Sequence, residues 1–75
     1  MNKTENQLRE QIAKLIHEEW VEWAKCVEHE VGEERQQRWH SVYCDYEELS
    51  EDMKDKDRAY VDKIIKVLKK ENIID

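Results

Sequence analysis

Residues 8–31, LREQIAKLIHEEWVEWAKCVEHEV, decide the fold of this chain. Eight large apolar residues of this stretch recur every three or four positions, apart from one adjacent pair, and this spacing places them on one stripe of a helix. The positions between them are mainly Glu, Lys, Gln and Arg, which lose little rotamer freedom in a helix. We therefore expect one helix over about 4–31, with Gly32 as its left-handed C-terminal stop. The apolar stripe consists of Leu8, Ile12, Leu15, Ile16, Trp20, Trp23, Val27 and Val31.

Two shorter helices are predicted after this one. Residues 33–40 open with two glutamates, which favour a helix N-terminus, and contain no helix breaker. Residues 41–49, SVYCDYEEL, are rich in β-branched, aromatic and Asx residues and are expected to form a connector. Ser50 is the expected N-cap of a third helix, which ends near Lys70. Its apolar stripe should pack on the first helix or on a second subunit, because isolated short helices are marginal. This stripe comprises Met53, Tyr60, Val61, Ile64, Ile65 and Leu68.

The composition supports an all-α fold. The chain has 75 residues with one Gly and no Pro, whereas an all-β protein needs frequent turns built from Gly, Pro and Asn. We predict one domain over 1–75 with its core in 8–70. The first helix, roughly 40 Å long at 1.5 Å per residue, overhangs so small a globule, and a homo-oligomer of two or more copies is therefore expected. No apolar run of about 20 residues and no signal peptide is visible, so the predicted location is cytoplasmic, with no membrane partner.

The charge balance limits the partners. The net charge is −6, from 19 acidic and 13 basic residues, and such a surface repels a phosphate backbone. We therefore predict no general nucleic-acid binding, although a local pocket for a small anion remains compatible. Cys26 and Cys44 are expected to be reduced thiols. No spacing seeds a tetrahedral zinc site, and the Gly-rich turns of common catalytic motifs are absent, so no metal, cofactor or enzymatic activity is predicted.

Aromatic and arginine residues supply the candidate binding site. Indole and phenol rings offer flat faces for stacking, and an Arg guanidinium offers a planar fork for phosphate or carboxylate. An aromatic platform beside an Arg fork is what a nucleotide-like molecule requires. Two interpretations stay open at this point, because Trp20 and Trp23 fall on the apolar stripe and would also suit a hydrophobic core. The candidate ligand-binding residues are Trp20, Trp23, Arg35, Arg38, Trp39 and Tyr46.

Two blocks of the sequence resemble the ryanodine-receptor (RyR) repeat domain. The first is IHEEW, residues 16–20, which is similar to the aliphatic–His–acid–x–Trp signature of the repeat. The second is YEELSEDMKDKDR, residues 46–58. Small phage and prophage proteins carry similar blocks. The Gly-Trp-x-Tyr-Gly segment and the C-terminal Gly-Tyr strand of RyR repeats are absent here, so the β-hairpin of the family is not expected. The matches in the second block are Tyr46, Leu49, Lys54, Asp57 and Arg58.

The resemblance implies a ligand-sensing module. In RyR repeats the signature Trp stacks on a nucleotide and Arg meets its phosphates, and prokaryotic members are associated with nucleotide-signalled defence. Carried over by position, this points to Trp20 for stacking and to Arg38 or Arg35 for the phosphate. The resemblance gives Asp57 and Arg58 a role in supporting the fold. It also implies that a single repeat needs a second subunit to clasp its ligand.

Three hypotheses of function follow. The leading one is a non-enzymatic binding protein that captures a nucleotide-derived signalling molecule, acting as a phage sponge against host nucleotide-signalled immunity. The alternative is an acidic, anti-CRISPR-like inhibitor or adaptor that binds a host defence protein by nucleic-acid mimicry, which the charge of −6 motivates. The third is an oligomerisation module whose tryptophans are core residues without a ligand.

Overall fold

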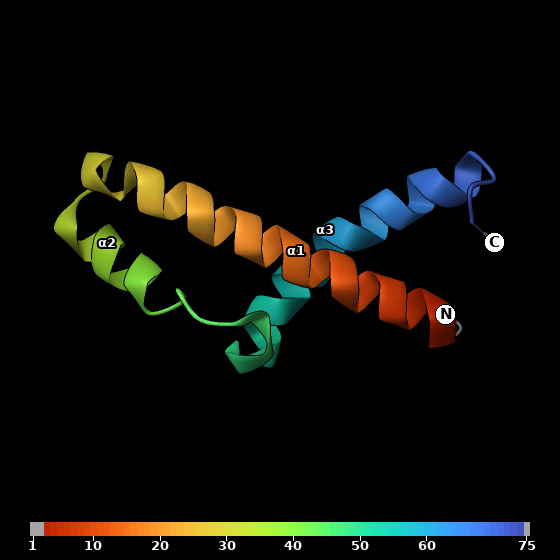
Figure 1. Cartoon of the computed structure of the whole chain (residues 1–75), viewed down its shortest axis with the longest axis horizontal. Helices are drawn as coiled ribbons and strands as arrows, with labels where there is room; N and C mark the ends of the chain where they lie inside the picture. Colours follow the sequence, from red (N-terminus) through yellow and green to blue (C-terminus); the bar gives the residue numbers. More distant parts are fainter. Residues whose placement is uncertain (1–2, 75) are drawn as a thin grey trace.

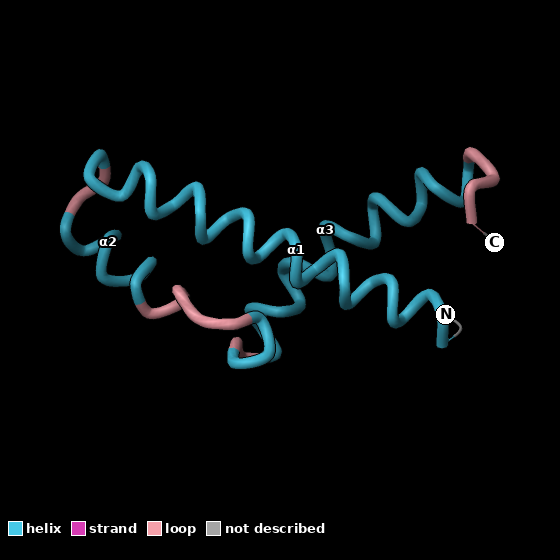
Figure 2. The backbone as a smooth tube through the Cα atoms, in the orientation of Figure 1, coloured by secondary structure: helices cyan, strands magenta, loops and turns pink. Residues whose placement is uncertain are grey.

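The computed structural model describes residues 3–74 as three α-helices and two short 3₁₀ turns (Figure 1). The tube in Figure 2 shows helices joined by short loops, and no strand occurs between residues 3 and 74. The predicted all-α class with a long first helix is confirmed, while the outermost positions of the predicted domain 1–75 lie outside the described residues. The elements are α1 (Lys3–Val27), η1 (Glu28–Glu30), α2 (Glu33–His40), η2 (Tyr46–Glu48) and α3 (Glu51–Lys70).

Helix α1 is the longest element, and the other two helices lie against it. Helix α3 crosses α1 near its middle and then diverges from its N-terminal half in this view, whereas α2 lies beside its C-terminal half (Figure 1). The principal extents are 45 × 22 × 15 Å, so the single chain is elongated. Within residues 3–74, none of the helices combines the length and the apolar character that crossing a bilayer requires.

The hydrophobic core lies at the crossing of α1 and α3. Ala13 is fully buried there, and its small side chain lets the two helices approach closely opposite Val61 and Ile65. The connector contributes Tyr46 and Leu49 to the same cluster. The expected packing of the first and third helices on each other is therefore confirmed. The core is small, so polar contacts between α1 and α3 are needed to supplement it.

Ion pairs line one side of the crossing. Arg58 of α3 donates three hydrogen bonds of 2.6 to 3.2 Å to the carboxylate of Glu10 on α1. Arg9 on α1 forms a bidentate pair with Asp62 on α3, at 2.8 and 2.9 Å. Arg58 and Arg9 thus tie α1 and α3 together at the crossing.

The ends of α3 follow recognised capping rules. Ser50 is its N-cap, as predicted, and its hydroxyl accepts a hydrogen bond of 3.3 Å from the backbone N–H of Met53. At the other end Asn72 adopts a left-handed conformation (φ 59°), and the N–H of Ile73 donates to the carbonyl of Leu68. This Schellman arrangement turns the chain back, so that Ile74 packs against the core.

The end of the first helix is a correction to the prediction. α1 stops at Val27 rather than near residue 31, and Gly32 is extended (φ −67°, ψ 159°) as the N-cap of α2 rather than a left-handed stop. The physical reason is a contact that helical spacing does not encode. The side-chain amide of Gln36 donates to the carbonyls of Glu28 and Val31, at 2.6 and 3.1 Å, and so binds backbone groups that a continuing helix would use.

Candidate ligand-binding cleft

Glu28 fixes α2 against the C-terminal end of α1. Its carboxylate accepts a hydrogen bond of 2.8 Å from the Tyr43 hydroxyl and one of 3.1 Å from His40 Nε2. The Tyr43 bond lowers the pKa of the Glu28 carboxyl. Burial, together with the same carboxylate, raises the pKa of Tyr43 to about 12, so its phenol stays a donor at neutral pH. These contacts set the position of the indole on α2, Trp39.

Trp39 lies between the two indoles of α1. Its ring centroid is 5.7 Å from that of Trp20, at an interplanar angle of 73°, and 5.8 Å from that of Trp23, at 45°. Tyr43 approaches Trp20 at 6.1 Å and 58°. Because both neighbours of Trp20 are strongly tilted, neither ring lies parallel against its faces.

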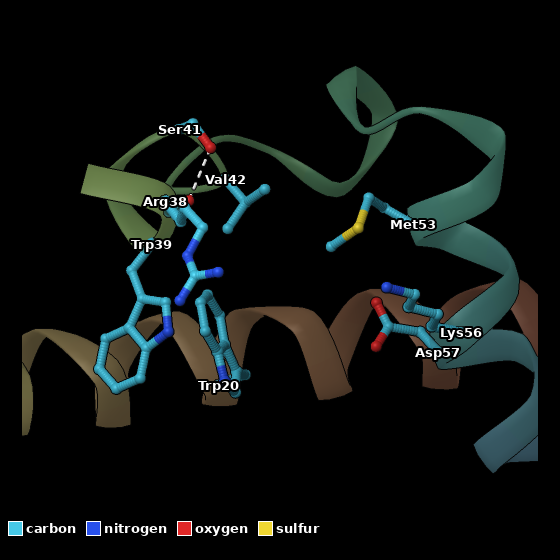
Figure 3. Close-up of a pocket in the computed structure, with 8 residues that line it drawn as sticks. All are labelled: Trp20, Arg38, Trp39, Ser41, Val42, Met53, Lys56 and Asp57. Atoms are coloured by element: carbon cyan, nitrogen blue, oxygen red, sulfur yellow. Dashed lines mark hydrogen bonds between the residues drawn. The ribbon is translucent and has the colours of Figure 1, made fainter. Parts of the chain in front are cut away.

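A cleft of about 480 Å³ opens beside Trp20, between the end of α2 and the start of α3 (Figure 3). The volume is within the range of small-molecule sites. In Figure 3 the Trp20 ring rises from α1 with Arg38 and Trp39 on one side and the α3 residues on the other. The bond from the Ser41 hydroxyl to the Arg38 carbonyl, 2.6 Å long, closes the end of α2. We call this site the Trp20 cleft; it is lined by Trp20, Arg38, Trp39, Ser41, Val42, Met53, Lys56 and Asp57.

Three charged side chains face the Trp20 cleft: Arg38, Lys56 and Asp57. None of them forms a side-chain hydrogen bond or an ion pair with residues 3–74. Burial raises the pKa of the Asp57 carboxyl, and the charge of nearby His17 opposes this shift. The cleft thus combines apolar walls with two cations and one carboxylate, a net positive site on an acidic chain.

Comparisons with protein-family models, curated proteins and solved structures found no match. The Trp20 cleft must therefore be interpreted from its own chemistry. Within residues 3–74, no group of three or more His, Cys, Asp or Glu side chains is placed to hold a metal ion. His17 is buried, and its Nε2–H donates to the carbonyl of Cys44 at 2.6 Å, so it links α1 to the connector. Cys26 and Cys44 are both free thiols, as predicted.

Half of the predicted site residues meet in the Trp20 cleft. Trp20, Arg38 and Trp39, which come from two helices, line it together. Helical spacing left open whether Trp20 is a core residue or a binding-site residue, and this arrangement bears on that choice. Trp20 is half-buried rather than sealed in the core, and its indole forms part of a cavity wall.

The other three predicted residues lie elsewhere. Tyr46 is a core residue, 5% exposed, whose hydroxyl donates to Glu10 at 3.3 Å; its place in the candidate site is a correction. Arg35 is exposed on α2 and does not line the cleft, because it lies one turn before Arg38 and so away from the end of α2, where the cleft opens. Trp23 is 55% exposed and contacts the cleft only through Trp39.

The sequence did not predict the wall of the cleft that α3 provides. Met53, Lys56 and Asp57 complete the site from across the crossing. Met53 and Asp57 are four residues apart, so they share one helix face, and this spacing is the only signal the sequence offers. It does not reveal that this face lies opposite Trp20, because the crossing of α1 and α3 decides that.

Proposed function

We propose that this chain is a non-enzymatic binding protein that captures a nucleotide-derived molecule in the Trp20 cleft. The observation that carries the proposal is the meeting, in one cavity, of two indoles with two cations that form no ion pair with residues 3–74. Arg9, Arg58 and Lys69 form ion pairs with carboxylates, whereas Arg38 and Lys56 face the cleft and form no ion pair with residues 3–74.

The charge of the cleft favours an anion. Arg38 and Lys56 contribute two positive charges against the one negative charge of Asp57. A guanidinium and an ammonium bind phosphate oxygens by charge-assisted hydrogen bonds. The surrounding acidic surface would repel polyanions, so a small ligand that reaches only the cleft suits the charge distribution better than a nucleic acid chain.

The walls of the cleft favour a flat ring. Base–aromatic stacking contributes about 1–3 kcal/mol per base, and Trp offers the largest stacking face of any side chain. Trp20 has no parallel ring packed on it within residues 3–74, and Val42 and Met53 add apolar surface on the far side. The resemblance to RyR repeats implies the same Trp20-centred stacking, and for a phage-encoded chain it implies a sponge.

A titration with matched variants tests this proposal. Linear and cyclic nucleotides are titrated by calorimetry up to roughly 100 μM, which corresponds to about −5.5 kcal/mol. Arg38→Ala should weaken binding by about tenfold, and Arg35→Ala, one turn away and outside the cleft, should not. Both residues are exposed, so neither variant should unfold the protein. Absence of binding for every nucleotide, or equal loss in the two variants, would contradict the proposal.

We further propose that the chain forms a homodimer. It exposes 5798 Å² of surface, whereas a compact 9.2 kDa monomer exposes about 4,900 Å². The excess is similar to the roughly 800 Å² per partner of a standard interface. Tyr60, Ile64 and Val67 form an apolar stripe on α3, of which Tyr60 is 60% and Val67 57% exposed.

Light scattering after size exclusion tests the dimer. The wild type should elute with twice the monomer mass, and Val67→Lys should shift it toward the monomer because a charge would be buried at the interface. Gln37→Lys, which adds the same charge to an exposed position of α2, is the control and should remain dimeric. A monomeric wild type at 100 μM would contradict the dimer without affecting the Trp20 cleft.

A second candidate function rests on the negative charge of α1. Glu18, Glu19 and Glu22 are exposed on α1 and form no ion pair with residues 3–74. Such a row suits an acidic inhibitor or adaptor that docks on a basic groove of a host defence protein. Binding of this kind should weaken steeply between low and high salt. It should keep its affinity in Arg38→Ala, whereas this substitution should weaken ligand capture in the cleft by about tenfold.

A further inference from the structure

Asp57 is the residue of the Trp20 cleft that the capture of an anion does not explain. Its carboxylate faces the cavity from α3, beside Lys56 and across from Trp20 (Figure 3). It is half-buried, and no side chain or backbone group of residues 3–74 donates a hydrogen bond to it. Besides the attraction of nearby His17, it has no hydrogen-bonded partner within residues 3–74 such as the one that Arg58, the next residue, finds in Glu10.

Within residues 3–74, this half-buried carboxylate accepts no hydrogen bond. Both of its oxygens only accept when it is ionised, and a polar group that loses water without gaining a partner destabilises the protein. The raised pKa of Asp57 has this origin, since loss of hydration is its largest cause. A ligand that brings two adjacent N–H groups would restore both hydrogen bonds.

The bases differ in what they offer to a carboxylate. Guanine presents two neighbouring donors on one edge, the ring N1–H and the exocyclic amino group, and these match the two oxygens of a carboxylate. Adenine and cytosine each place an acceptor nitrogen beside their amino group, and this lone pair would face the second oxygen. Uracil places its single N–H between two carbonyls. Only guanine therefore satisfies both oxygens without repulsion.

We propose that the ligand of the Trp20 cleft carries a guanine base, whose Watson–Crick edge pairs with the Asp57 carboxylate while its ring stacks on Trp20. The inference rests on the proposed function and narrows it to guanine nucleotides. The phosphate then lies away from Asp57, toward Arg38 on the α2 side, because like charges would repel. Arg38 and the Asp57 carboxylate thus serve opposite ends of one ligand.

Calorimetry with three 5′-monophosphates tests the pairing, those of guanosine, adenosine and xanthosine. Xanthine replaces the amino group of guanine by a carbonyl, so it matches an asparagine amide, which accepts with its oxygen and donates with its nitrogen. The wild type should bind the guanosine compound about tenfold or more tightly than the adenosine compound, as one bidentate base contact provides. Asp57→Asn should lose this preference and bind the xanthosine compound best. Asp52→Asn, exposed and outside the cleft, should behave as the wild type.

The outcomes separate this inference from the proposed function. Equal binding of the guanosine and adenosine compounds, still weakened by Arg38→Ala, would overturn the guanine pairing and leave capture in the Trp20 cleft standing. Unchanged or tighter binding of the guanosine compound by Asp57→Asn would also overturn the pairing. Failure of all three compounds to bind the wild type and both variants would overturn the inference and the proposed function together. Circular dichroism of both variants checks that they fold.

Discussion

Replacing Arg58 by methionine should weaken the attachment of α3 to α1. The Arg58 side chain is only 16% exposed, and it bonds Glu10 on the other helix as well as Glu51 and Asp55 on its own. Removing a hydrogen bond to a charged group costs about 1.5–3 kcal/mol. Because Glu10 is 42% exposed and screened by solvent, we expect a net loss of about 2 kcal/mol. For a domain of this size the melting temperature would fall by roughly 8–16 °C.

The stability difference between the wild type and Arg58→Met should depend on pH. The hydrogen bond from Arg58 lowers the pKa of Glu10 and is also the main cause of the lowered pKa of Glu51. A carboxyl with a lowered folded pKa stabilises the fold above its unfolded pKa, near 4.3, and this stabilisation is lost as the pH falls through the folded value. The difference between the wild type and Arg58→Met should therefore be full at pH 7 and shrink as the pH falls below about 4.

Thermal unfolding followed by circular dichroism at pH 7 and pH 2.5 measures both effects. Methionine keeps an unbranched apolar stem in place of the arginine methylenes, so the loss reports mainly on the charged contacts. Arg35→Met is the matched control, since Arg35 is exposed and forms no ion pair with residues 3–74. Equal melting temperatures of Arg58→Met and the wild type at pH 7 would refute the reasoning. A difference of the same size at both pH values would refute the assignment to Glu10 and Glu51.

Three further perturbations give distinct results. Val61→Ala should cost about 2 kcal/mol in urea unfolding, because Val61 is fully buried at the crossing; a neutral result would mean that the crossing is not the core. Trp23→Ala should cost much less than the about 3–5 kcal/mol of a buried Trp, since Trp23 is largely exposed, and a loss of that size would place it in the core. Asp57→Asn should stabilise the protein at pH 7 and not at pH 3. Burial raises the pKa of Asp57 in the folded protein, although the attraction of His17 opposes this shift. The wild type therefore loses stability as the pH rises through the pKa that Asp57 has in the folded state. A flat difference across this range would contradict the prediction.

The helices could be predicted because their signals are local. The spacing that predicts the first helix and the hydroxyl of Ser50 act within a turn or two of the chain, and both helices are found in the structure, although the first ends at Val27. The end of α1 could not be predicted, because it depends on Gln36 of a later helix, whose side chain binds the carbonyl of Glu28. A side-chain contact across eight positions leaves no periodic trace in the sequence.

The site was only half predictable for a related reason. Trp20 and Trp39 could be named because aromatic rings near an arginine are rare enough to notice in a short chain. Tyr46 looked equivalent, and only the path of the connector shows that it packs in the core. Lys56 and Asp57 belong to a helix whose crossing with α1 brings them to the cleft. That crossing depends on long-range packing around Ala13.

The indole N–H signals of the three tryptophans offer the most direct measurement of the central claim. Each Trp gives one such signal in a ¹H–¹⁵N spectrum, assigned by single Trp→Phe variants. On addition of guanosine 5′-monophosphate, the account predicts the largest shift for Trp20, a smaller one for Trp39 and the smallest for Trp23, which lies outside the cleft. A Trp20 signal that stays in place at saturating ligand, while the other two shift, would contradict capture in the Trp20 cleft.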